Sequence, residues 1–154
     1  MSALVQGIDA EAKAVARFVE LLKEEQEILS GGAIGRLDGL VQSKNQVATE
    51  LGLLAEQRNA FLTARGLAVD NKGVEAWLAA HPSSKASRDI WSRILALAVQ
   101  ARDLNRMNGE LIQVRMQHNA QALEILLGAS RQQSLYGPDG QSAPQNTRRI
   151  NDSV

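Results

Sequence analysis

Two histidines, His81 and His118, are the side chains in this sequence best suited to proton transfer or metal binding. Neither follows a glutamate by three residues, so the Glu-x-x-His pairs that hold two metal ions inside helical bundles are missing. The chain has no cysteine, which excludes disulfides, thiol nucleophiles and cysteine-bound zinc. We therefore expect no metal site, and we interpret His118 as a polar residue of a helix seam rather than as a catalyst.

A glycine pair, Gly31-Gly32, with Gly35 close behind, is the nearest approach to a phosphate-binding loop. It lacks the Lys-Ser/Thr of such a loop and no strand precedes it, so the pattern predicts a turn between helices. The sequence also lacks a nucleophile elbow, a metalloprotease helix and a dinucleotide-binding loop. We therefore predict a binding protein, with no catalytic residue and no cofactor, rather than an enzyme.

Composition favours one elongated all-α domain. The 154 residues are 44% hydrophobic but only 3% aromatic, which is typical of helices packed through aliphatic side chains. Seventeen basic and seventeen acidic residues cancel, which disfavours nucleic acid as the main partner. The N-terminus lacks the features of a secretory signal, and the longest apolar run, 94–99, is too short to span a bilayer. We expect a cytoplasmic protein that does not insert directly into a membrane.

The longest helical pattern runs from Ser87 to Gly128, where we expect the helix to end. It would be roughly 60 Å long, so it must lie along other helices for most of its length. Three polar residues, Asn108, Arg115 and His118, interrupt its apolar seam. The apolar or small residues of this seam follow coiled-coil spacing and are Ile90, Ile94, Leu97, Ala101, Leu104, Leu111, Ala122 and Ile125.

A shorter N-terminal helix of about twenty residues is expected to begin at an N-cap on Asp9. Its acidic residues are interpreted as a solvated face, with a docking patch for a basic partner as the alternative. These residues are Glu20, Glu24, Glu25 and Glu27.

A second long helix is predicted for residues 35–65, about 45 Å in length. Its apolar residues keep coiled-coil spacing if Lys44 and Arg58 are allowed as polar positions of the seam. A short helical corner at about residues 72–81 should follow, ending at His81-Pro82. We expect Trp77 and Trp91 to pack in the core of this corner, the alternative being a ligand site.

The helix at 35–65 is the expected antiparallel neighbour of the last helix, which would set Asn45 beside Asn108 and Asp38 near Arg115. A buried polar layer at Asn108 would fix the register. In this alignment the end of the last helix is left uncovered and becomes a candidate binding surface. The alternatives are that the first helix covers it or that two copies of the chain bury it together. The uncovered residues are Leu123, Ile125, Leu126 and Leu127.

We divide the chain into a helical bundle domain, 1–130, and a flexible C-terminal tail, 131–154. The tail is rich in Gln, Ser, Asn, Gly, Pro and Arg, and it cannot bury enough apolar surface to order itself. Tyr136 stands before the turn-forming segment 137–140. Its ring is either presented for a contact or packed against the end of the helix.

The C-terminal third of the sequence resembles the FlgN family of flagellar export chaperones. The resemblance rests on Asn108-Gly109-Glu110-Leu111-Ile112, on His118-Asn119 followed by Leu123-Glu124-Ile125-Leu126-Leu127-Gly128, and on Leu135-Tyr136-Gly137-Pro138-Asp139-Gly140. The helical pattern agrees over nearly the whole chain.

This resemblance implies a cytoplasmic chaperone that binds the hook-filament junction proteins FlgK and FlgL and delivers them to the flagellar type III secretion apparatus. It also implies that the C-terminal helical region, residues 111–128, holds the client. The expected client-binding residues are Leu111, Val114, Leu123, Ile125, Leu126 and Leu127. The residue matching the family's tail tyrosine, Tyr136, is expected to engage the export-gate protein FlhA.

Two other functions remain open at this point. The first is a structural coiled-coil adaptor of the export machinery that has no client of its own. The second is a helical regulator that binds nucleic acid, against which the balanced charge argues.

Overall fold

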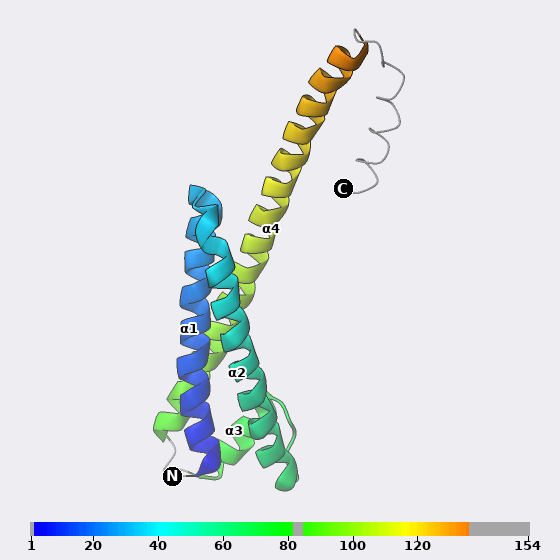
Figure 1. Cartoon of the computed structure of the whole chain (residues 1–154). Coiled ribbons are helices and arrows are strands. Elements are labelled where there is room, and N and C mark those ends of the chain that lie inside the picture. Colours follow the sequence, from blue (N-terminus) through cyan, green and yellow to red (C-terminus); the bar gives the residue numbers. More distant parts are fainter. Residues whose placement is uncertain (1, 82–84, 136–154) are drawn as a thin grey trace. The chain divides into compact units, whose positions relative to one another are not determined.

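The computed structural model describes residues 2–81 and 85–135, and these residues confirm the all-α prediction (Figure 1). No strand occurs among them. The elements are α1 (Ala3–Gly31), the 3-10 turn η1 (Ile34–Arg36), α2 (Leu37–Ala64), α3 (Asn71–Ala79) and α4 (Lys85–Leu135).

Helix α1 begins earlier than the sequence suggested, so the predicted N-cap at Asp9 is wrong. Ser2 is the N-cap, and its hydroxyl accepts a hydrogen bond from the Val5 backbone N–H at 3.3 Å. Asp9 lies inside the helix and pairs with Lys13 at 3.1 Å. With 29 residues, α1 is not shorter than the 28-residue α2.

The expected turn between the first two helices is present at the glycine pair. Gly32 adopts the left-handed conformation with φ 83°, and its N–H donates to the Ile28 carbonyl. A side chain at this φ would be strained, which explains why glycine suits the end of α1.

The short corner contains α3 and holds both tryptophans, as predicted. Asp70 caps α3 by accepting a hydrogen bond from the Gly73 N–H at 3.1 Å. Trp77 and Trp91 are buried in one apolar cluster, and the Trp91 Nε1–H donates to the Asn71 side chain at 2.7 Å. This bond ties the start of α4 to the corner.

Helix α4 continues through Gly128 to Leu135, so the predicted end at Gly128 is wrong. A single glycine inside a helix costs about 1 kcal/mol relative to alanine, which does not by itself end a helix of this length. The tail proposed to begin at residue 131 is therefore helical as far as Leu135, and the rest of it lies outside the described residues.

The chain divides into two compact units, residues 1–109 and 110–154. The first unit contains α1, α2, α3 and the first part of α4. The second unit, as far as it is described, is the remainder of α4.

Within the first unit, α2 runs antiparallel to α1, and the first part of α4 runs parallel to α1. Arg17 of α1 pairs with Glu50 of α2, and residues before and after Arg17 pair in the reverse order along α2. Two apolar clusters lie along the unit. The larger contains Leu4, Ile8, Val15, Leu62, Val74, Trp77, Leu78, Trp91 and Ile94, and the smaller contains Val19, Leu22 and Ala101.

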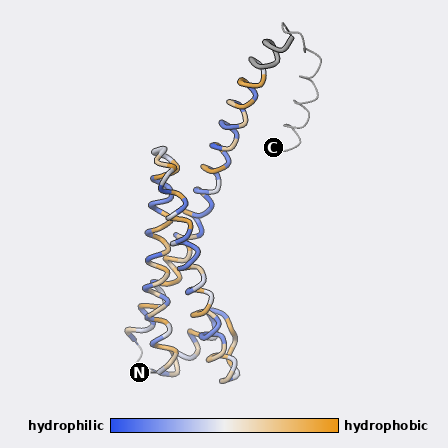
Figure 2. Tube along the Cα trace, viewed as in Figure 1, coloured by the Kyte–Doolittle hydropathy of each residue, from blue (hydrophilic) through white to orange (hydrophobic). Residues whose placement is uncertain are grey.

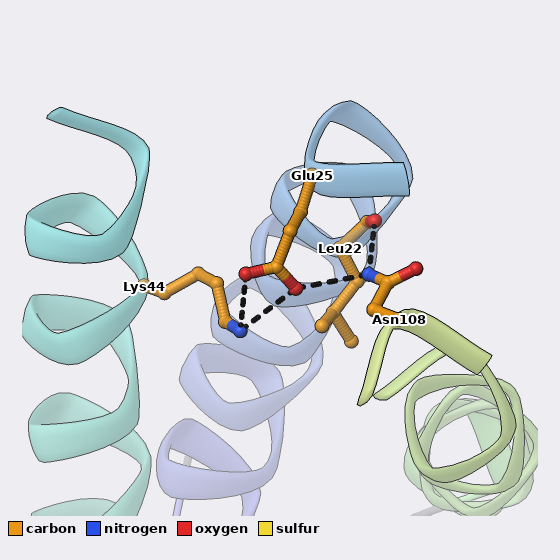
Figure 3. A network of polar contacts seen from close by, with 4 residues as sticks. All are labelled: Leu22, Glu25, Lys44 and Asn108. Carbon is orange, nitrogen blue, oxygen red and sulfur yellow. Dashed lines mark hydrogen bonds and ion pairs between the residues drawn. The ribbon is translucent and has the colours of Figure 1, made fainter. Parts of the chain in front are cut away.

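A polar layer crosses the three helices of the first unit (Figure 3). The Lys44 Nζ of α2 donates to both carboxylate oxygens of Glu25 at 3.0 Å each. From α4, the Asn108 side-chain amide donates to the Leu22 carbonyl and to Glu25, both at 2.9 Å. The predicted buried layer at Asn108 is confirmed, but its partners lie on α1.

Two details of the predicted pairing are therefore wrong. Asn45 is exposed and is not the partner of Asn108. Glu25 is buried and is not part of a solvated face, because Lys44 neutralises it inside the bundle.

A second ion pair joins α1 and α2 nearer the corner. Arg58 of α2 donates to the buried Glu11 of α1, and its guanidinium lies over the Trp91 ring at 5.2 Å from the centroid. Lys44 and Arg58, the two polar seam positions inferred for α2, thus both neutralise a glutamate of α1.

Replacing Gly73 by alanine should destabilise the protein by about 1–3 kcal/mol, because the new Cβ would lie 1.7 Å from the Ala68 carbonyl oxygen. The free energy of unfolding in urea measures this. Gly52→Ala is the control: the position lies in α2, a methyl group there would meet open space, and the change should stabilise by roughly 0.5–1 kcal/mol. Equal effects at the two positions would contradict the close approach at Gly73.

Replacing Lys44 by methionine should cost about 3–5 kcal/mol, because the buried Glu25 carboxylate would lose its counter-charge. The double variant Glu25→Gln/Lys44→Met should recover most of this loss, since no charge is then buried while the Asn108 amide keeps an acceptor. Urea unfolding of both variants provides the comparison. A loss below about 1 kcal/mol for Lys44→Met would mean that the pair behaves like a surface salt bridge.

Candidate functional site

The histidines show no arrangement for catalysis. The ring of His81 stacks on Trp77 with centroids 3.9 Å apart, and its Nδ1–H donates to the Trp77 carbonyl at 2.8 Å. His118 is exposed on α4. Among residues 2–81 and 85–135, no group of three His, Cys, Asp or Glu residues could hold a metal ion.

Two cavities of the first unit are small. One of about 220 Å³ lies between α1 and α2 beside Gly7, Arg58 and Phe61. Another of about 270 Å³ lies between α1 and α4 beside Asp9, Lys13 and Arg93. Neither combines a nucleophile with a base, so neither has the parts of an active site.

The second unit carries a different feature, an exposed row of apolar side chains on α4. Ile112, Met116, Leu123 and Leu126 are 39%, 62%, 48% and 66% exposed. Their spacing alternates between four and three residues when Asn119 is counted between Met116 and Leu123. This spacing places them on one side of the helix. We call this set the apolar stripe. Figure 2 shows hydrophobic residues recurring along this part of α4 between hydrophilic ones.

The six residues predicted to bind a client do not all share this face. Leu123 and Leu126 belong to the apolar stripe, while Leu111 and Leu127 are half-buried. Val114 and Ile125 are exposed and lie three turns apart, on the side of the helix opposite the apolar stripe.

The predicted client-binding set left out Ile112 and Met116. Coiled-coil spacing alone favoured Leu111 and Arg115 at this point of the seam. A straight helix has 3.6 residues per turn, so its apolar face gradually departs from a strict seven-residue repeat. At this point of α4 the face has moved by one residue, from Leu111 and Arg115 to Ile112 and Met116.

The apolar stripe is suited to holding another helix. A row of Leu, Ile and Met at helical spacing packs against an apolar helix face through dispersion and the hydrophobic effect. Methionine adapts to partners of different shape because its side chain is unbranched and flexible. The second predicted site, Tyr136, lies outside the described residues.

No helix among the described residues is both long and apolar enough to cross a membrane. No solved structure gives a significant match to the chain.

Sequence comparison identifies relatives over most of the chain. The model of the FlgN protein family matches residues 1–144. A flagella synthesis protein FlgN of Yersinia enterocolitica serotype O:8 is 30% identical over 139 residues, which cover 89% of this chain and 87% of that protein. The flagella synthesis protein FlgN of Proteus mirabilis is 27% identical over 144 residues, covering 92% and 91%.

A third relative, from Salmonella typhimurium, carries the same name and is 27% identical over 145 residues, covering 93% of this chain and 92% of its own length. FlgN is not a known enzyme family. The extent of the family match, together with the all-α fold, shows that the chain belongs to the FlgN family.

Proposed function

We propose that the protein is a cytoplasmic export chaperone that binds the hook-filament junction proteins FlgK and FlgL and delivers them to the flagellar type III secretion apparatus. Family membership supports a role in flagellum assembly, because the relatives are named flagella synthesis proteins. The exposed apolar stripe on α4 is the observation that carries the chaperone role.

The client-binding surface in this proposal is the region from Leu111 to Leu127. Ile112 and Met116 extend the residues expected from the sequence, and Val114 and Ile125 supply a second apolar face on the opposite side of the helix. A surface of this kind would cover an apolar helix of the client and prevent its premature association with other subunits.

Release of the client from such a surface needs no nucleotide. Separate aliphatic contacts, each contributing up to about 1.5–3 kcal/mol when fully buried, give an affinity that a competing surface of the export apparatus can overcome. Tyr136 is proposed to provide the chain's own contact with the export-gate protein FlhA.

The double variant Leu123→Ala/Leu126→Ala should bind FlgK and FlgL more weakly, by up to about 3 kcal/mol, because it removes two large side chains from the apolar stripe. Titration calorimetry measures the affinity, and circular dichroism should show unchanged helix content. Leu53→Ala, which truncates a 56% exposed leucine of α2, is the control and should leave binding unchanged.

The same titration distinguishes a chaperone from a structural adaptor. A complex of fixed stoichiometry that is lost when the residues after Leu111 are deleted supports the chaperone. An unfolded double variant would instead show that Leu123 and Leu126 belong to a core, and absence of any complex with the full chain would favour the adaptor.

Changing Tyr136 to alanine should reduce binding to the FlhA cytoplasmic domain and lower client secretion, while client affinity and Tm stay near wild type. Tyrosine combines a large apolar ring with a hydroxyl, which suits it to a contact of this kind. Pull-down with the FlhA domain and a secretion assay measure the effect. Unchanged FlhA binding would leave Tyr136 only a role in packing at the end of the helix.

A further inference from the structure

The first part of α4 is held on α1 very unevenly along its length. At the corner end, Trp91 and Ile94 are buried in the larger apolar cluster, and Trp91 also contacts Arg58 and Asn71. Further along, only Ala101 is a buried apolar residue of α4 in the smaller cluster. Leu104 packs there while remaining half-buried, and the half-buried Leu97 packs against both clusters.

Asn108 holds α4 to α1 near the end of the first unit. Its amide is 1% exposed and donates to the Leu22 carbonyl and to Glu25. Its Oδ1 has no hydrogen-bond partner, although it is buried. An unpaired buried oxygen is unfavourable and offsets part of the stabilisation from the two hydrogen bonds. Asn108 therefore holds α4 on α1 only weakly.

Separation of this segment from α1 would leave no uncompensated charge behind. Both oxygens of Glu25 are bound by Lys44 of α2, so the ion pair is complete within α1 and α2 (Figure 3). Helix α4 contributes only a neutral amide to the layer. The large penalty for exposing half of a buried ion pair therefore does not oppose the separation.

We propose that residues 97–109 of α4 detach from α1 when a partner binds, so that the partner covers Leu97 and Leu104. This inference rests on the proposed function. Leu97 and Leu104 lie seven residues apart in the same helix and so share a face, which the partner can cover in place of α1.

The partner would take the place of α1 on this face of α4, so its side chains should resemble those of α1. Helix α1 presents Val19 and Leu22 to this face, followed by the Glu25 carboxylate that accepts from Asn108. The partner is therefore an amphipathic helix with aliphatic residues at helical spacing and an acidic side chain about one turn beyond them.

Cysteine labelling tests the detachment directly, because the chain has no cysteine of its own. Val19→Cys places one thiol on α1 beneath the segment, and Ala14→Cys places one at a position of α1 with the same 2% exposure. In the free protein, opening of the segment should make the thiol at position 19 react with a soluble disulfide reagent about tenfold faster or more than the thiol at position 14. Equal protection of both thiols would overturn the proposal.

Two further measurements separate a specific detachment from general loosening. Adding Asn108→Ala should speed labelling at position 19 but not at position 14. Saturation with purified FlgK should also speed labelling at position 19, because the departing segment uncovers that part of α1. If FlgK binds but slows labelling or leaves its rate unchanged, the proposal fails while the client-binding stripe stands. If FlgK does not bind the full chain, the proposed function fails instead.

Discussion

The first unit depends on two buried ion pairs between α1 and α2. Glu11 meets Arg58 and Glu25 meets Lys44, and the two glutamates are separated by the same number of residues as the two bases. Each buried charge has one partner that can neutralise it, so a shift of α2 along α1 would leave both glutamates unpaired in an apolar interior. The pairs therefore fix the register of the two helices, and α4 then packs on them through Trp91 at one end and Asn108 at the other.

The two units have different roles. The first is a folded core with a fixed register, and the second exposes an apolar row on α4. In the first unit most of the large aliphatic residues are buried or half-buried, whereas residues 112–126 keep theirs exposed to solvent. A first unit that is stable without the apolar residues of 112–126 leaves those residues available to a partner. The binding surface can therefore be apolar without destabilising the core of the first unit.

The sequence predicted the fold class, the glycine turn, the corner and the polar seam positions of α2, because helical periodicity and capping residues are local signals. It misplaced the start of α1 because both Ser2 and Asp9 are good N-cap types. It misread Glu25 as solvated and paired Asn108 with α2. The helix that lies opposite a buried amide is decided by how the three helices pack together. The apolar pattern of each single helix does not contain that information. The apolar stripe was found in part, because Leu123 and Leu126 fit both a strict seven-residue repeat and the true helical pitch.

The central claim is that the apolar face of α4 between Leu111 and Leu127 holds the client. Hydrogen exchange of the backbone amides, compared between the free protein and its purified complex with FlgK, tests it most directly. Protection gained on binding should concentrate in residues 111–127 of α4, with little gain along α1 and α2. Protection gained along α1 or α2, with exchange in residues 111–127 unchanged, would contradict the claim.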